Sequence, residues 1–414
     1  MARRCVVVGG GVVGGLTALH LVEQGAEVTL VEAATPGSGT SGTTFAHVNA
    51  SYAGYWEYFE LRAAGVAGYR RLRSELGSAP WLVDTGFLQI ERSARKQQEL
   101  AEHAARLRDA GYSVAHVSPQ RVRARLAPEL VIGGGEEIFF YPDEGYVEVH
   151  RMLEHLLRAG RQLGLDVRQH ERVVGLEAAG AGVRGVALES GERLPADVVL
   201  CCCGRWTDQI LALAGVELSL MVPDAPTSVA PGLIVVSEPV LSRLERVVCV
   251  DGLNVRPDGG GRLMLWSDDL DARVQSLGTW GLSGPLPSLP DELPRRAVEL
   301  GARYVPALAG AEVEKAHVCL RVLPRDGLPV VGWVPQTEGL YVIAAHAAVT
   351  MAPILGELAA QEILHSREAP ALERFRPDRF STQPSRPART LERERAGATA
   401  TSQQGAPSRV SART

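Results

Sequence analysis

The chain has 414 residues, 45% hydrophobic and 22% charged, so it is long enough for two domains with ample core. Its formal net charge of -5 gives no general electrostatic footprint for nucleic acid, and no apolar run approaches the length of a membrane span. Its six cysteines, three of them consecutive, form neither a disulfide framework nor a C-x-x-C metal site. We therefore expect a soluble, cytoplasmic protein with no nucleic-acid partner, no metal and no membrane span.

The first elements in chain order are a strand, a glycine turn, a helix and a second strand. An apolar run that ends in Val8 leads into the spacing Gly9-x-Gly11-x-x-Gly14, and the second strand closes on Glu32. This fingerprint is typical of a dinucleotide-binding βαβ unit, whose diphosphate meets the amides of the helix N-terminus. Gly9 permits the sharp turn, Gly11 admits the diphosphate and Gly14 lets the helix lie close to the sheet. Glu32 can accept both ribose hydroxyls, which disfavours NADP and leaves FAD and NAD open.

The rest of the chain carries helix and strand patterns separated by loops. Helical periodicity covers about 55–76, 94–110, 150–164 and 351–365. Strand patterns cover 86–90, 166–168, 185–189, 197–200 and 339–345. Residues from about 233 to 270 alternate like antiparallel strands, with a hairpin turn at 258–261. The glycine- and hydroxyl-rich segment 36–44 is a loop, and the residues beyond Phe380 have the composition of a disordered tail.

This order predicts an α/β protein with a discontinuous, Rossmann-like nucleotide-binding domain, because we expect the strands at 185–189 and 197–200 to rejoin the first βαβ unit. We assign residues 1–50, 145–215 and 325–381 to that domain. Residues 51–144 and 216–324 then form a second, α+β substrate domain built on a mixed or antiparallel sheet, and 382–414 form the tail.

Four further segments carry a more specific resemblance: residues 37–41, 143–147, 196–206 and 320–332. In order and spacing they resemble the D-amino-acid oxidase superfamily of FAD-dependent oxidoreductases, which includes glycine oxidase, sarcosine oxidase and D-amino-acid dehydrogenase. The resemblance runs from Val6 to about Ile363 and favours FAD over NAD. Two departures stand out: Val322 replaces a usual proline, and the segment 346–353 lacks the glycines found in many members. We expect Pro353 to occupy the first turn of the last helix, whose amides face the flavin.

The resemblance implies a set of cofactor-binding residues along the whole chain. They are Gly9, Gly11, Val12, Val13, Gly14, Glu32, Ala33, Ser38, Gly39, Thr40, Ser41, Thr43, Val173, Cys203, Gly204, Trp206, Val349, Thr350 and Met351. It also places Cys319 where sarcosine oxidases carry a covalent flavin link. A small buried hydrophobe is the alternative for this cysteine, and we expect non-covalent FAD.

The resemblance implies that a hydride passes from the carbon bearing the amine to flavin N5, giving an imine that water hydrolyses. Arg321 is then the candidate for binding a substrate carboxylate. The alternative is that Arg321 forms a structural ion pair with an acidic residue. His346 either orients substrate or serves packing, and His47 and Asn49 line the ring. Tyr52 either binds substrate or belongs to the core. No general base is required, because a buried amine can lose its proton to water.

The substrate is thus a small amino acid or amine, and oxygen or another acceptor takes the electrons. Two rival functions stay open at this point. One is an oxidase of the same fold whose amine substrate has no carboxylate, in a specialised biosynthetic pathway. The other is a non-catalytic flavin-binding subunit of a dehydrogenase complex. Substrate handedness and oligomeric state are also open.

Overall fold

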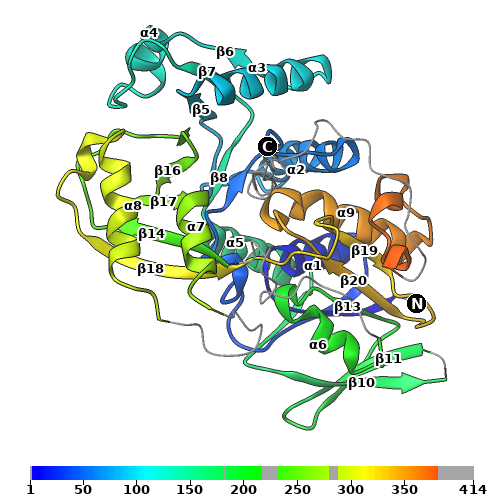
Figure 1. The fold of residues 1–414 in the computed structure, drawn as a ribbon. Coiled ribbons are helices and arrows are strands. Elements are labelled where there is room, and N and C mark those ends of the chain that lie inside the picture. Colours follow the sequence, from blue (N-terminus) through cyan, green and yellow to red (C-terminus); the bar gives the residue numbers. More distant parts are fainter. Residues whose placement is uncertain (1, 181, 217–230, 279–287, 381–414) are drawn as a thin grey trace, which may run out of the picture.

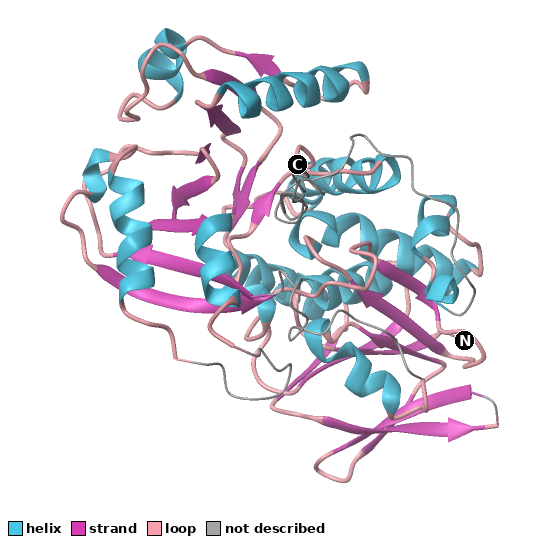
Figure 2. Ribbon diagram, in the orientation of Figure 1, coloured by secondary structure: helices cyan, strands magenta, loops and turns pink. Residues whose placement is uncertain are grey.

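The computed structural model of the protein describes residues 2–180, 182–216, 231–278 and 288–380. The predicted tail 382–414, and the parts of the segment 216–324 at 217–230 and 279–287, lie outside the described residues. Figures 1 and 2 show two larger sheets, with helices packed on both.

The first sheet has six strands in the order β19-β20-β13-β1-β2-β9. Five of them are parallel, and only β19 runs antiparallel to its neighbour β20. In sheet order the strands are β19 (Val330–Trp333), β20 (Leu340–Ala344), β13 (Val198–Cys201), β1 (Arg4–Val8), β2 (Glu27–Glu32) and β9 (Asp166–Gln169). Central strands of this kind are buried on both faces, which explains why β1, β13 and β20 are near-continuous runs of Val, Leu, Ile and Tyr.

Three helices pack together beside this sheet: α1 (Val12–Glu23), α5 (Val149–Gln162) and α9 (Ala348–His365). Helix α1 packs against both others, and α2 (Trp56–Glu75) packs against α9. The approach of α9 to α1 is close, since a Cβ on Gly356 would lie 3.0 Å from the Thr17 amide nitrogen. Leu16 and Leu19 are fully buried here, and each such side chain stabilises the fold by about 2 kcal/mol.

The second sheet has eight strands in the order β18-β14-β17-β16-β15-β5-β7-β6. It is mixed, because β15 and β5 pair in parallel while the other pairs are antiparallel. In sheet order the strands are β18 (Val313–Leu320), β14 (Pro231–Ser237), β17 (Leu263–Ser267), β16 (Leu253–Pro257), β15 (Val247–Val250), β5 (Phe87–Glu91), β7 (Glu137–Tyr141) and β6 (Ala115–His116). Helices α7 (Asp268–Gln275) and α8 (Glu292–Ala302) pack on β14, and α3 (Ala94–Asp109) packs on β5 and β7.

Two small three-stranded sheets and some short helices complete the described chain. One sheet holds β10 (Val173–Ala179), β11 (Gly182–Leu188) and β12 (Arg193–Pro195). The other holds β3 (His47–Val48), β8 (Gly145–Val147) and β4 (Leu82–Val83). The short helices include α4 (Pro119–Arg121), α6 (Thr207–Ala212), and the 3-10 turns η1 (Thr40–Thr43) and η3 (Gly204–Trp206).

The prediction that residues 185–189 rejoin the nucleotide sheet is wrong. Residues 185–188 belong to β11, which pairs antiparallel with β10 and β12 in the separate small sheet. The connections on either side of β11 are too short for a crossover, and short connections join antiparallel neighbours. Only β13, at 198–201, enters the six-stranded sheet from this region.

The prediction for Pro353 is also wrong, because α9 begins at Ala348 and the proline lies inside the helix. A proline there has no N–H to donate to the carbonyl four residues earlier, which is that of Val349. The Tyr69 hydroxyl, from α2, donates to the Val349 carbonyl instead. The contact between α2 and α9 therefore satisfies the acceptor that Pro353 leaves open.

Candidate active site

The glycine turn between β1 and α1 has the tight backbone that the fingerprint predicts. Gly9 has a φ of 106°, and a Cβ there would lie 2.5 Å from the Cys202 carbonyl oxygen. A Cβ on Gly14 would lie 1.9 Å from the Gly9 carbonyl oxygen. Both glycines are thus required by close backbone approach. Gly11 precedes α1 in an extended conformation without a side-chain cap of its own, so the first helical turn suits an anionic group, although the Val12 amide already donates to Ser41 Oγ.

Glu32 is held at the carboxyl end of β2, next to this turn. Its Oε2 accepts a hydrogen bond from the Gly10 amide at 2.8 Å, and its Oε1 accepts one from the Ala34 amide at 2.8 Å. Ala33, between Glu32 and Ala34 in the chain, is exposed. A carboxylate has about four acceptor positions, so Glu32 keeps capacity for the hydroxyls of a ribose.

The loop at 36–44 connects the glycine turn with the second sheet. Ser41 Oγ accepts from the Val12 amide at 3.1 Å, and Thr40 Oγ1 donates to the Leu320 carbonyl at 2.9 Å. The Thr43 carbonyl lies 3.2 Å from His317 Nε2 on β18. Ser38 is an exposed residue just before η1. The loop therefore brings the fingerprint and the end of β18 to one place.

The segment after β13 also contacts the loop at 36–44. The Cys203 thiol donates to the Val8 carbonyl at 3.2 Å, and a Cβ on Gly39 would lie 3.1 Å from the Trp206 ring. Gly204 turns the chain with a φ of 54°. Arg205 stacks 4.2 Å from the Trp206 ring centroid, and its buried Nε has no hydrogen-bond partner among the described residues. A buried N–H of this kind beside a backbone cradle can donate to an acceptor on a cofactor.

The remaining predicted cofactor residues lie at the same end of the sheet or at the start of α9. Val173 follows β9 and is buried with Val8 and Val31. Thr350 Oγ1 donates to the His47 carbonyl at 3.1 Å and accepts from the Asn49 amide at 3.2 Å. Val349 and Met351 are buried beside Thr350. Ligands of parallel sheets bind outside the carboxyl ends of the strands, and that is where these segments converge.

Arg321, directly after β18, forms an ion pair with Asp271 of α7. Its guanidinium also lies 5.6 Å from the Trp266 ring centroid. Burial acts to lower the pKa of Arg321, but the field of Asp271 outweighs it and holds this pKa above its ordinary value. The structure thus contains the structural ion pair that was the alternative to carboxylate binding. Both partners come from the predicted segment 216–324.

His346, between β20 and α9, lies in the fields of two arginines. Burial, together with Arg321 and Arg62, lowers the pKa of His346 to about 3, so the imidazole is neutral at physiological pH. The Tyr58 hydroxyl donates to the His346 carbonyl at 3.3 Å. A neutral imidazole can donate one hydrogen bond and accept another, but it presents no charge to a substrate.

Asn49 holds Arg62 in place. Arg62 Nε donates to the Asn49 carbonyl at 2.9 Å, and its Nη2 donates to the Asn49 side-chain oxygen. Both residues are buried. Asn49 therefore acts on the site through Arg62, a residue that the sequence patterns did not single out.

His47 is packed among aromatic rings rather than open to a ligand. Its ring centroid lies 4.7 Å from that of Phe87 and 5.9 Å from that of Tyr52, and its side chain is 8% exposed. Burial, with Arg62 and Arg256, lowers the pKa of His47 well below its ordinary value. This arrangement favours a packing role for His47, and for Tyr52 the core alternative.

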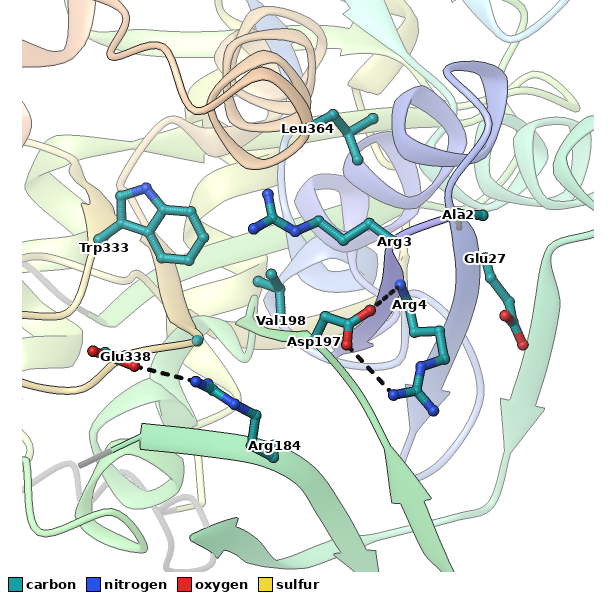
Figure 3. Close-up of a pocket in the computed structure, with 11 residues that line it drawn as sticks. Ala2, Arg3, Arg4, Glu27, Arg184, Asp197, Val198, Trp333, Glu338 and Leu364 are labelled. Atoms are coloured by element: carbon teal, nitrogen blue, oxygen red, sulfur yellow. Dashed lines mark hydrogen bonds and ion pairs between the residues drawn. The ribbon is translucent and has the colours of Figure 1, made fainter. Parts of the chain in front are cut away.

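A groove elsewhere on the molecule is separate from this site. It is lined by Arg3, Arg4, Asp197 and Glu338, with Arg184 paired to Glu338 at 3.1 Å (Figure 3). It lies at the amino ends of β1, β13 and β20, whereas the predicted cofactor residues lie at their carboxyl ends.

Comparison with known proteins decides the family. The DAO family of FAD-dependent oxidoreductases matches residues 4–362 of this chain. The chain belongs to this DAO family. As a DAO-family protein it is an FAD-dependent oxidoreductase, and the glycine turn, Glu32 and the loop at 36–44 fit that cofactor.

Individual relatives agree with this family. Glycine oxidase of Geobacillus kaustophilus is 24% identical over 373 residues, which cover 86% of this chain and 91% of the relative. Glycine oxidase of Pseudomonas aeruginosa is 27% identical over 359 residues, covering 84% and 90%. The crystal structure of L-proline dehydrogenase from P. horikoshii has a TM-score of 0.79 at 18% identity, covering 93% of this chain and 99% of that one. The structural likeness confirms the predicted α/β fold.

Cys319 of this DAO-family chain is buried beside the loop at 36–44. Burial raises its pKa, while Arg321 and the Thr43 hydroxyl oppose that rise. Non-covalent binding of FAD stays our prediction.

Three polar residues of the site escaped the sequence reasoning: Arg62, Asp271 and Arg205. Arg62 lies within a predicted helical pattern and Asp271 directly after a strand pattern, and neither pattern singles the residue out. Arg205 was quoted within the family segment without a role. Their shared signal is burial of a charged group, which the sequence alone does not show. Within the described part of the chain, no helix combines the length and apolarity that crossing a membrane requires.

Proposed function

We propose that this protein oxidises the C–N bond of a small amino acid or amine. When bound, FAD supplies the two-electron oxidation that turns the substrate C–N single bond into C=N. Water then adds to the imine carbon and releases a carbonyl compound and the amine. The protein's own residues bind the substrate, orient it and control its protonation.

One observation carries this proposal: Arg321 follows the strand end that the loop at 36–44 contacts, and Arg321 and Arg62 both lie close enough to His346 to lower its pKa. Arg321 lies next in sequence to Leu320, whose carbonyl accepts from Thr40 of that loop. The positive charges of both arginines help to lower the pKa of His346. A substrate amine bound here would lie close to positive charge.

That positive charge favours the chemistry. A nearby cation lowers the pKa of an amine, because it disfavours the ammonium form. Arg62 donates to a neutral acceptor, Asn49, so its charge is not balanced by that contact. The amine therefore binds unprotonated, with its electron pair available for oxidation. No side chain has to act as a general base, and neutral His346 is suited to orient the substrate by a hydrogen bond.

The names of the relatives support the same class of substrate. Glycine oxidase and L-proline dehydrogenase are both named for amino acids. The Asp271–Arg321 ion pair favours the second candidate, an amine whose carboxyl group is absent or masked.

The test is anaerobic bleaching of the flavin absorbance by a panel of amino acids, their amides and simple amines. We expect at least one C–N compound to reduce the flavin completely, and air or an artificial acceptor to restore the colour. If no member reduces the flavin while dithionite does, the non-catalytic subunit is the better description.

A further inference from the structure

Asp271 is held in place by more than its ion pair with Arg321. Its Oδ2 accepts from Trp266 Nε1 at 2.6 Å as well as from Arg321 Nη2. Its Oδ1 accepts from the Leu233 amide at 2.6 Å. The Asp271 side chain is 8% exposed and that of Arg321 is 17% exposed. The carboxylate would thus stay where it is even if Arg321 moved.

Both arginines of the site already have acceptors within the protein. Arg321 donates to Asp271 and, at 3.4 Å, to the Pro231 carbonyl. Arg62 donates twice to Asn49. A substrate carboxylate would have to share the guanidinium with these acceptors. At Arg321 it would also meet the negative charge of Asp271 in a largely buried setting, where like charges repel strongly.

A fixed charge in a binding site disfavours a ligand that carries a charge of the same sign. A site discriminates between two ligands either by contacts to one or by an unpaired or repelling charge against the other. A neutral amide can still accept from Arg321 through its oxygen without adding a second negative charge. Asp271 thus distinguishes a carboxylate from its uncharged counterpart.

We propose that Asp271 is a specificity-determining residue, whose negative charge disfavours binding of a free carboxylate at Arg321. The substrate presents an uncharged group there, such as an amide, an ester or a hydrocarbon. This inference rests on the proposed function, because it concerns the substrate of the same site. It departs from the expectation that Arg321 grips a carboxylate.

The experiment measures binding, without turnover, to the FAD-loaded protein. Isothermal titration calorimetry with benzoate and with benzamide gives a Kd for the acid and for its uncharged counterpart. We expect the wild-type protein to bind benzamide and to bind benzoate more weakly. Asp271→Asn keeps the shape of the side chain and removes its charge, so it should bind benzoate about tenfold more tightly than wild type.

Two further variants keep the result interpretable. Asp269→Asn makes the same charge change at an exposed position of the same helix and should leave both Kd values unchanged. Adding Arg321→Gln to Asp271→Asn should abolish the gain for benzoate, because that gain depends on a released guanidinium. Anaerobic flavin reduction by N-methylglycine and by its amide gives a second comparison in the wild-type protein.

Tighter binding of benzoate than of benzamide by the wild-type protein would overturn the inference, whether or not Asp271→Asn folds. So would an Asp271→Asn variant that folds, keeps its FAD and gains no affinity for benzoate. Failure of the proposed function looks different, because a protein that oxidises no C–N compound can still show this discrimination in calorimetry.

Discussion

At the carboxyl group of Glu144, burial and hydrogen bonding act in opposite directions. Its oxygens accept from the Ala50 amide at 2.9 Å, the Ser51 amide at 2.8 Å, the Ser51 hydroxyl at 2.9 Å and the Tyr112 hydroxyl at 3.0 Å. Burial raises the pKa of Glu144 from 4.5 to about 7, although these donors oppose the rise. The residue thus fixes the loop after β3, and its proton is retained better in the folded state than in the unfolded one.

The pH dependence of stability follows from that direction. The folded pKa is the higher one, so Glu144 stabilises the fold fully below about pH 4.5 and this contribution is lost as the pH rises through about 7. Glu144→Gln removes the titration. We expect the difference in unfolding free energy between this variant and wild type to grow in favour of the variant between pH 5 and pH 8, by up to about 3 kcal/mol. The unfolding temperature of the variant should rise relative to wild type in the same direction.

Melting curves at several pH values check this expectation. Glu154→Gln, at a side chain that is 75% exposed, is the matched control and should leave the pH dependence unchanged. A constant difference between Glu144→Gln and wild type across this pH range would contradict the role given to Glu144.

Gly14 gives the second prediction at the scale of a residue. Since a Cβ there would lie 1.9 Å from the Gly9 carbonyl oxygen, Gly14→Ala must displace the helix or the turn that we predict to bind FAD. We expect this variant to purify with little flavin absorbance per protein. Gly54→Ala, at a position with open space around it, should purify with normal colour. Full flavin content in Gly14→Ala would show that the turn does not hold the cofactor.

At the scale of an element, the start of α9 is strained. Ala347 has a left-handed backbone with φ 51° and ψ 28°, a conformation that costs an L-residue about 1–2 kcal/mol. The strain turns the chain from His346 into the helix whose first residues hold β3. The following Thr350 and the Tyr69 hydroxyl fix this helical start.

Replacing Ala347 by glycine should therefore stabilise the protein. Glycine relieves the left-handed strain, and its greater freedom in the unfolded chain offsets part of the gain, which leaves about 1 kcal/mol. Ala101→Gly, inside α3, should instead destabilise by about 1 kcal/mol. Thermal or denaturant unfolding of the two variants measures both. A lower unfolding temperature for Ala347→Gly would mean that the alanine side chain is needed at this turn.

Elements with a long period were predictable from sequence, and elements set by tertiary pairing were not. The buried positions of α5, which include Met152, Leu153 and Leu156, repeat at helical spacing, so its bounds agree within a few residues. The two-residue strands β3, β4 and β6 are too short to show a period, and β3 and β4 pair with β8, far away in the chain. The sheet to which β11 belongs depends on its turns, and its apolar pattern fits either sheet.

At the scale of the whole molecule, the site is assembled from segments that are distant in sequence. The fingerprint at Gly9–Gly14 was predictable because all its parts lie in one βαβ unit. Asp271 was not, since its meaning depends on Arg321, fifty residues later, and on Trp266 and Leu233 from neighbouring strands. The boundaries of the predicted domains stay a prediction, although strands of the two large sheets do come from alternating stretches of the chain.

The central claim is that this FAD-dependent oxidoreductase acts on a C–N bond. It is tested most directly by mixing the FAD-loaded protein anaerobically with the best compound of the panel and identifying the product by mass spectrometry. We predict one imine, or one carbonyl compound with its released amine, for each flavin that becomes reduced. Flavin reduction in which the C–N bond of the compound stays unoxidised would contradict the account.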